Sequence, residues 1–304
     1  MTGSLKSIVK YARRHWFIYA LLLPGLCFCG LFSYGPFYGL ILAFKDLNLK
    51  LGIWNSPWVG FENFKVLLTD PYFYTVVSNT VIINVYNIII GFPFTVFLAL
   101  MLSEIQRRYI KSTLQTAVYL PYFISWVVFA GIIRIMLNYN GIVNQMLESL
   151  FGTTYNFLTN PRSFRLLVVA ADIIKSSGYG TIIYLAAIAG VNPELYESAK
   201  VDGANRYHMI RHITLPRIFP SIAVLLIMRV ANLFGSNFDQ IFNLYNPLVY
   251  KTGDVLSTYI YRTGLGESRF EVATAQGMIF SVLGLFTALT ANRFIKRMNV
   301  MSIF

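Results

Sequence analysis

Long apolar stretches alternate with short polar segments along almost the whole chain. A helix needs about 20 apolar residues to cross the roughly 30 Å hydrocarbon core of a bilayer. Stretches of this length are expected near Trp16–Phe44, Thr75–Leu102, Thr113–Leu137, Phe164–Gly190, Ile218–Ile241 and Val272–Phe294. The first is longer than the apolar core of a signal peptide, so we expect it to be retained. The pattern therefore predicts an all-α integral membrane protein with six spans.

The composition agrees with this prediction. Hydrophobic residues make up 56% of the 304 residues and charged residues only 12%, whereas a soluble domain carries about a quarter charged residues. We therefore expect residues 1–304 to form a single transmembrane domain, with its six-helix membrane region at 16–294.

The charged residues indicate how the chain is oriented. Fourteen Lys and Arg residues and four acidic residues fall on the side of the two termini and the 191–217 segment. The opposite side carries eight of each. The positive-inside rule therefore places the N- and C-termini in the cytoplasm. Because the basic residues are dispersed over the span ends, the net charge of +12 is typical of a topology signal and argues against nucleic-acid binding.

A charged insert, residues 191–216, separates the fourth and fifth spans. Asn192-Pro193-Glu194 is a typical helix start, with a capping Asn and a proline at the first helical position. Gly203 can end this helix by adopting a positive φ. A second amphipathic segment, Ala204–Thr214, is expected to stop at Leu215-Pro216. Such an element suits docking into a groove of a partner, and an amphipathic loop on lipid headgroups is the alternative.

Polar residues inside the spans are candidates for a substrate pathway, because they are costly unless they face protein or a water-filled cavity. In the fifth span they recur at steps of three and four, which predicts one helical stripe. The candidate pathway residues are Arg229, Asn232, Ser236, Asp239, Asn243, Asn84, Asn87, Lys175 and Tyr179. Stripes of this kind also hold transmembrane helices together, and this alternative stays open.

The charges within the spans bear on the cargo. The spans contain three basic residues, Arg134, Lys175 and Arg229, and one acidic residue, Asp172. This excess of positive charge favours an anionic substrate. Asp172 and Lys175, at i and i+3, could instead neutralise each other.

The sequence contains no catalytic signature. It lacks the G-x4-G-K-[ST], G-x-S-x-G and H-E-x-x-H motifs. Cys27 and Cys29 lie in the first apolar stretch, and His208 and His212 have no third metal ligand beside them. We therefore expect no enzyme activity, metal or cofactor in this chain. The energy for any transport must come from another polypeptide or from an ion gradient.

Residues 197–216 read ESAKVDGANRYHMIRHITLP. Their spacing, E-x-A-x3-G-x9-I-x-L-P, resembles the EAA loop of ABC-importer permeases, with Ser198 in place of the first alanine. Residues 34–46, 58–64 and 78–80 resemble carbohydrate-uptake permeases of the maltose type. Residues 256–261, 273–275 and 301–304 resemble the subgroup that imports complex oligosaccharides or polysaccharide fragments. The chain departs from sugar-importing members in lacking a glycine-rich turn after Asp239 and a large extracytoplasmic domain.

This resemblance implies a type I importer permease in the bacterial cell (inner) membrane that works by alternating access. It implies a second homologous permease, two ATPase subunits that carry ATP and Mg, and an extracytoplasmic solute-binding protein that delivers an oligosaccharide. The residues implied to couple the chain to an ATPase are Glu197, Ser198, Ala199, Asp202, Gly203, Ala204, Ile213, Leu215 and Pro216. An ion-coupled secondary transporter is the alternative, although it would call for more intramembrane carboxylates than Asp172 and for inverted repeats.

Overall fold

The computed structural model describes residue 11 and residues 14–235 and 237–297, and most of them are helical. Its described residues form no β-strand, only an isolated antiparallel bridge between Lys45 and Trp58. The chain divides into two compact units. The first unit comprises residues up to Leu67 together with Thr263–Met278, and the second comprises Leu68–Arg262 together with the residues from Ile279 onward. The all-α prediction is confirmed.

The first unit begins with a helical run of 29 residues, Trp16–Phe44, which confirms the first predicted span. Its elements are α2 (Trp16–Cys29), the π-turn η1 (Gly30–Tyr34), the 3-10 helix η2 (Gly35–Phe44), α3 (Gly52–Asn55), most of α4 (Glu62–Thr69), the π-turn η6 (Arg262–Gly266) without Arg262, which belongs to the second unit, and the start of α17 (Phe270–Arg297). All side chains of α2 are exposed. An apolar helix that is exposed on every side suits a hydrocarbon environment.

The segment that follows this first span is held by side-chain bonds to the backbone. The side-chain amide of Asn63 donates to the carbonyl oxygens of Ala43 and Lys45, at 3.0 and 2.9 Å. The ammonium of Lys45 donates in turn to the carbonyls of Ile53 and Trp54, at 2.8 and 2.7 Å. These bonds fix the loop between η2 and α4.

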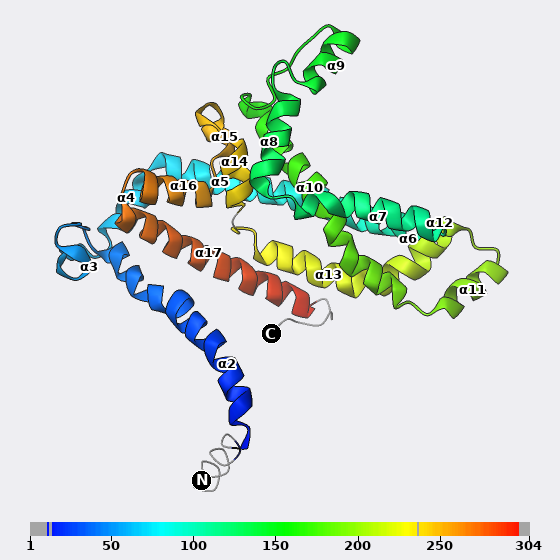
Figure 1. The fold of residues 1–304 in the computed structure, drawn as a ribbon, viewed down its shortest axis with the longest axis horizontal. Helices are drawn as coiled ribbons and strands as arrows, with labels where there is room; N and C mark the ends of the chain where they lie inside the picture. Colours follow the sequence, from blue (N-terminus) through cyan, green and yellow to red (C-terminus); the bar gives the residue numbers. More distant parts are fainter. Residues whose placement is uncertain (1–10, 12–13, 236, 298–304) are drawn as a thin grey trace. The chain divides into compact units, whose positions relative to one another are not determined.

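The second unit is a helical bundle around α10. Its elements are α5 (Pro71–Tyr86), the π-turn η3 (Asn87–Gly91), α6 (Phe92–Ser103), α7 (Arg108–Phe123), α8 (Trp126–Leu137), α9 (Ile142–Phe151), α10 (Pro161–Ala189), α11 (Pro193–Val201), α12 (Arg206–Met209), the π-turn η4 (Ile210–Thr214), α13 (Leu215–Ala231), α14 (Phe238–Leu244), the 3-10 helix η5 (Pro247–Val249), α15 (Tyr250–Gly253), α16 (Leu256–Tyr261) and the rest of α17. Helix α10 packs against α6, α7, α13 and α15 (Figure 1).

Small and apolar residues bring these helices together. One buried cluster joins α8, α10 and α14 and includes Phe164, Val168 and Ile241. A Cβ atom at Gly178 of α10 would clash with the backbone of Val118 in α7. Glycine at this position therefore lets the two helix backbones touch, as small residues do in pairs of membrane helices.

Six segments of the described residues are long and apolar enough to cross a membrane. They are Trp16–Phe44, Pro71–Ser103, Trp126–Phe151, Pro161–Ala189, Arg206–Ala231 and Phe270–Arg293. The predicted number of spans is confirmed. Four of the six lie within a few residues of their predicted positions, whereas the third and the fifth are displaced.

The third predicted span, Thr113–Leu137, is wrong as a single helix. Helix α7 ends at Phe123 and α8 begins at Trp126, with Ser125 capping α8 by accepting from the Val128 N–H at 3.4 Å. The apolar segment in this region runs from Trp126 to Phe151 instead. Apolar residues on both sides of the break conceal it in the sequence, because hydropathy does not register a backbone turn.

The fifth predicted span, Ile218–Ile241, is displaced toward the N-terminus. Helix α13 ends at Ala231, and the Gly235 N–H closes a turn on the Asn232 carbonyl at 2.8 Å before α14 begins. At the other end, the prediction that Leu215-Pro216 stops the preceding segment is also wrong. The π-turn η4 continues directly into α13, and Pro216 lies in the first turn of α13, where a missing N–H costs little.

Candidate functional site

The 191–216 loop forms the helix–glycine–helix element that the sequence predicts. The Asn192 side chain caps α11 by accepting from the Glu194 N–H at 3.1 Å. Gly203 has a φ of 78° and ends the helix, and Asn205 caps α12 by accepting from the His208 N–H at 2.9 Å. The predicted helix start and the predicted positive φ are both confirmed.

One face of this loop is anchored to the bundle. Leu195 and Tyr196 of α11 pack with Ile210 and Ile213 against a buried cluster built from α6, α10 and α13. The Tyr196 hydroxyl and the Thr214 hydroxyl are hydrogen-bonded at 2.9 Å. The two short helices are therefore held to each other and to the spans, and a force on one is carried to the other.

The opposite face of the loop is exposed. The residues implied to couple to an ATPase divide between the two faces: Glu197, Ser198, Asp202, Gly203 and Pro216 are exposed, and Ala199, Ala204, Ile213 and Leu215 are half-buried. The exposed group can contact a partner, whereas the half-buried group faces its own chain.

Two apolar residues stand out on the exposed face, and one of them, Val201, escaped the sequence analysis. Val201 is 88% exposed and Tyr207 is 63% exposed. Large apolar side chains presented to water beside charged ones are typical of a contact surface. The signal in the sequence was an apolar residue, Val201, placed between the charged residues Lys200 and Asp202 at the end of α11.

A polar cavity of about 160 Å³ lies among the candidate pathway residues of the second unit. We call it the polar cavity, and the residues that line it are Trp126, Asp172, Asn237, Phe238, Asp239 and Gln240. Asp172 accepts from the Ser176 hydroxyl at 2.9 Å, and Gln240 donates to the Val168 carbonyl at 2.6 Å. Carboxylates beside aromatic rings can hold hydroxyl groups and flat apolar faces together.

The predicted helical stripe of the fifth span does not exist. Arg229 lies in the last turn of α13, Asn232 lies in the turn that follows, and Asp239 and Asn243 belong to α14. Ser236 lies outside the described residues. The break between the helices ends the common periodicity, so only Asp239 of this set lines the polar cavity. Arg229 and Asn232 are exposed.

Lys175 is buried and does not face the polar cavity as a free cation. Its ammonium donates to the carbonyls of Pro121 and Tyr122, at 3.1 and 2.9 Å, and also to the carbonyl of Ile124. It also lies over the ring of Trp126, 5.3 Å from the centroid. Lys175 therefore satisfies the open carbonyls at the C-terminus of α7, a position that favours a positive charge.

The three remaining pathway candidates, Asn84, Asn87 and Tyr179, differ in exposure and in their contacts. Asn84 donates to the Leu233 carbonyl at 2.9 Å, so it fixes the turn between α13 and α14. Asn87 is buried in η3, and its side-chain oxygen has no hydrogen-bond partner among the described residues. Tyr179 stacks on Tyr122 with a centroid distance of 3.9 Å and is 43% exposed. Of these three, Tyr179 presents the most surface to a ligand.

The sequence of residues 91–300 matches the family described as "binding-protein-dependent transport system inner membrane component". The chain belongs to this family. The permease is 37% identical over 282 residues to the polygalacturonan/rhamnogalacturonan transport system permease protein YteP of Bacillus subtilis (strain 168), a match that covers 92% of this chain and 88% of that protein.

Two solved bacterial structures resemble the permease. One is an ABC transporter involved in the import of the acidic polysaccharide alginate, with 41% identity, a TM-score of 0.89 and coverage of 96% of this chain and 99% of that chain. The other is an alginate ABC transporter in complex with an alginate pentasaccharide-bound periplasmic protein, with 40% identity, a TM-score of 0.88 and coverage of 97% and 99%. The predicted fold, an ABC-importer permease, is confirmed.

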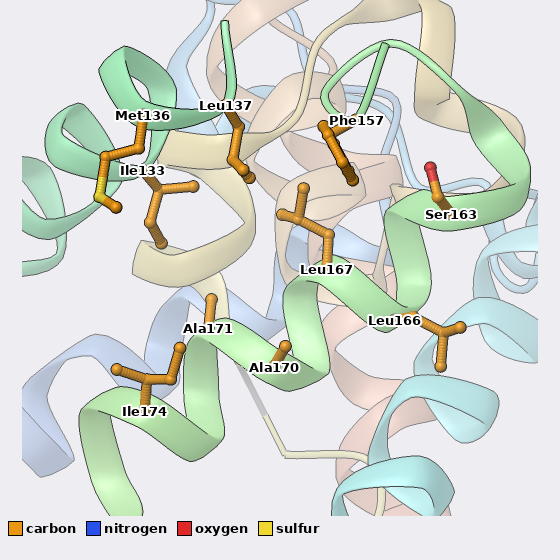
Figure 2. A pocket seen from close by; sticks show the side chains of 10 residues that line it. All are labelled: Ile133, Met136, Leu137, Phe157, Ser163, Leu166, Leu167, Ala170, Ala171 and Ile174. Carbon is orange, nitrogen blue, oxygen red and sulfur yellow. The ribbon is translucent and has the colours of Figure 1, made fainter. Parts of the chain in front are cut away.

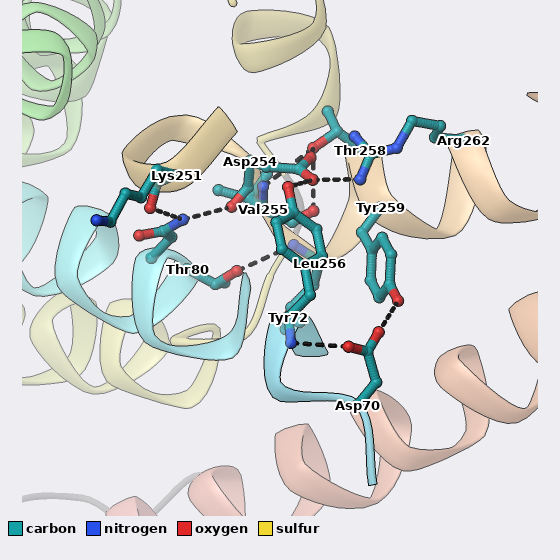
Figure 3. A network of polar contacts seen from close by, with 11 residues as sticks. Asp70, Tyr72, Thr80, Lys251, Asp254, Val255, Leu256, Thr258, Tyr259 and Arg262 are labelled. Atoms are coloured by element: carbon teal, nitrogen blue, oxygen red, sulfur yellow. Dashed lines mark hydrogen bonds and ion pairs between the residues drawn. The ribbon is translucent and has the colours of Figure 1, made fainter. Parts of the chain in front are cut away.

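The permease also contains a buried network that the sequence analysis missed. We call it the polar clamp, and its members are Tyr72, Asn79, Asp254, Thr258 and Arg262 (Figure 3). Asn79 of α5 donates to the Asp254 carbonyl at 3.0 Å and accepts from Arg165 of α10 at 2.7 Å. The polar clamp thus ties the starts of α5 and α10 to the segment that holds α15 and α16.

A second, larger cavity of the permease is apolar. It has a volume of about 450 Å³ and lies between α8 and α10 (Figure 2). Its lining includes Ile133, Leu167 and Ile174, and Ser163 contributes its only hydroxyl. A lining without hydrogen-bond partners does not suit a hydroxyl-rich cargo, so the polar cavity is the better candidate for the substrate pathway.

Proposed function

We propose that this permease forms half of the translocation pathway of an importer of acidic polysaccharide fragments that contain uronates. The observation that carries the proposal is the similarity of 37 to 41%, over nearly the full chain, to a polygalacturonan/rhamnogalacturonan permease and to alginate transporters. In the proposed mechanism the permease alternates between inward-open and outward-open states. It has no catalytic residues of its own.

The proposed assembly contains a second, homologous permease, two ATPase subunits and an extracytoplasmic solute-binding protein. ATP and Mg would be held by the ATPase subunits. The exposed face of the 191–216 loop supports this assembly, because it combines carboxylates with the bare side chain of Val201 and is backed by an anchored inner face. Closure of the ATPases would then move this loop and the helix that continues from it.

The proposed orientation puts both termini and the 191–216 loop in the cytoplasm. The excess of basic residues on that side supports it. After replacement of Cys27 and Cys29, single cysteines at Val201 and Lys50 can be labelled with a membrane-impermeant maleimide. We expect labelling at Val201 only in inverted vesicles and at Lys50 only in intact cells, and the reverse pattern would refute the orientation.

The proposed cargo contact lies at the polar cavity. Asp172 and Asp239 can accept hydrogen bonds from sugar hydroxyls, and the rings of Trp126 and Tyr179 offer flat apolar faces. Arg229, exposed at the end of α13, is the pathway cation that remains available to a uronate, because the ammonium of Lys175 is occupied by carbonyls. The anionic preference therefore rests on the exposed cations Arg134 and Arg229 and on the relatives.

The experiment is a comparison of matched cargoes. The complex is purified with its partners, reconstituted in liposomes, and supplied with its binding protein and either oligogalacturonate or malto-oligosaccharide of equal length. We expect uptake and stimulation of ATP hydrolysis with the uronate sugar. Stimulation by the neutral sugar alone would refute the anionic cargo, and a permease that purifies without an ATPase and still transports would refute the assembly.

A further inference from the structure

A continuous set of aromatic rings leads away from the polar cavity. We call it the aromatic strip, and its members are Phe238, Phe242, Tyr245, Tyr250 and Tyr261, which come from α14, the residue that follows it, α15 and α16. Neighbouring ring centroids lie 5.0 to 6.0 Å apart along the strip. These spacings are those of contacting aromatic side chains.

The aromatic strip and the polar cavity share a residue. Phe238 lines the polar cavity and also stacks on Phe242, one helical turn further along α14. Beyond it, Phe242 and Tyr261 are 37% and 40% exposed, although their rings touch each other at 5.0 Å. Rings that served only to fill the core would be buried. The exposed parts of the Phe242 and Tyr261 rings are therefore available to a ligand.

The strip is also held rigidly. The guanidinium of Arg262 lies 4.7 Å from the ring centroid of Tyr250, and the same guanidinium is bonded to buried Asp254 of the polar clamp. Tyr261 directly precedes Arg262 in the sequence, so the clamp fixes the backbone that carries it. A binding surface whose side chains are fixed beforehand loses less entropy when a ligand is bound.

We propose that the aromatic strip is a second binding surface for the same cargo, on which sugar residues that follow the one in the polar cavity stack. This inference rests on the proposed function. A pyranose ring presents axial C–H groups with positive partial charge on its face, and these groups suit the negative face of an aromatic ring. Phe238 and Phe242 are four residues apart on α14, a rise of about 6 Å, which is close to the length of one sugar residue.

In this proposal the aromatic strip sets the preference for long over short cargo, and it does not distinguish one sugar from another. Stacking uses the ring faces that uronate and neutral sugars share, whereas the polar cavity contacts the hydroxyls of the leading residue. A monosaccharide occupies the polar cavity without reaching Phe242 or Tyr261. A longer cargo contacts both surfaces and gains affinity from the second by an intramolecular contact.

The test compares galacturonate monosaccharide with a hexasaccharide of galacturonate in the reconstituted complex with its binding protein. The variants are Phe242→Ala, Phe242→Leu and Tyr261→Ala, and the matched controls are Phe151→Ala and Tyr139→Ala, which alter exposed rings at and just before α9. We expect each strip variant to raise the apparent KM of the hexasaccharide by about three- to tenfold and to leave that of the monosaccharide unchanged. The controls should change neither.

Phe242→Leu separates stacking from packing, because leucine keeps much of the apolar volume without a ring. If this variant behaves like the wild type, or if a strip variant affects both lengths equally, the strip is a packing element and the proposal is wrong. The proposed function can fail separately. A wild-type complex that imports only neutral sugars would refute the uronate cargo, and the same length comparison with malto-oligosaccharides would still decide whether the strip binds sugar.

Discussion

The guanidinium of Arg262 donates from Nη2 to Oδ2 of Asp254 at 2.7 Å, and the carboxylate of Asp254 is fully buried. Tyr72 donates to the same oxygen and Thr258 to the other, both at 2.7 Å. Burial alone lowers the pKa of Arg262, but its hydrogen bond to Asp254 and the charge of that carboxylate outweigh burial and raise the pKa above the ordinary value. The ion pair is therefore not weakened as the pH rises toward the ordinary arginine pKa.

Arg262→Met should destabilise the permease strongly. The substitution leaves the Asp254 carboxylate buried without its counter-charge, which costs about 3–5 kcal/mol. Thermal unfolding of the purified complex measures the effect. Lys65→Met, which removes an exposed ion pair with Glu62 at 4.0 Å, is the matched control and should leave the apparent Tm unchanged. Equal melting of the two variants would show that the polar clamp carries little stability.

Lys175→Met distinguishes a structural lysine from a ligand for anions. The variant leaves the Tyr122 carbonyl without its donor, at a cost of about 1–3 kcal/mol for a buried acceptor, whereas the Pro121 carbonyl keeps the Ile124 N–H. We expect a lower apparent Tm and the same relative change in KM for acidic and neutral oligosaccharides. A rise in KM for acidic cargo alone, with an unchanged Tm, would show that Lys175 contacts the cargo and is not a structural residue.

Gly178→Ala tests the close approach of α7 and α10. The added methyl group meets the backbone of Val118 and forces the helices apart, and such overpacking costs about 1–3 kcal/mol. Gly131→Ala in α8 is the control, because a Cβ there meets nothing within 4 Å. We expect the apparent Tm to fall for Gly178→Ala and to stay unchanged for Gly131→Ala. Similar Tm values for the two variants would contradict the close approach of α7 and α10.

Gly203→Pro and Glu197→Arg test the proposed coupling loop. Proline fixes φ near −65°, which is incompatible with the 78° of Gly203, and Glu197→Arg reverses an exposed charge of α11. We expect ATP hydrolysis to continue while uptake per ATP falls by about tenfold or more, the scale of a typical coupling free energy.

The control for the loop variants is Gly152→Pro, which imposes the same backbone conflict at a φ of 66° after α9. It should leave the ratio of uptake to ATP hydrolysis unchanged. Normal coupling in both loop variants would refute the docking role of the 191–216 loop.

Hydropathy predicted the number of spans, and local chemistry predicted the start of α11 at Asn192 and the backbone conformation of Gly203. These features depend on residues that are close together in the sequence. The breaks before Trp126 and after Ala231 could not be predicted in this way. Polar residues at steps of three and four have the same spacing whether or not the helix that carries them is continuous.

The interactions of Lys175 and the polar clamp are long-range. Tyr72 and Asp254 are 182 positions apart, and Lys175 reaches carbonyls more than 50 positions away. In the sequence, Lys175 is a cation within a span, and only the position of α7 beside α10 reveals that it caps a helix. The same applies to the aromatic strip, whose rings come from three short helices and one connecting residue.

The uninterrupted helix from Arg206 to Ala231 has a mechanical consequence. Its 26 residues run from α12 through the π-turn at Ile210–Thr214 into α13, which contains Pro220. A π-turn and an interior proline are places where a helix bends, so a displacement applied at Arg206 is redirected there before it reaches Ala231. The helix ends at the Asn232–Gly235 turn, which precedes the polar cavity, so a movement that begins at the 191–216 loop ends beside the site where the cargo is proposed to bind.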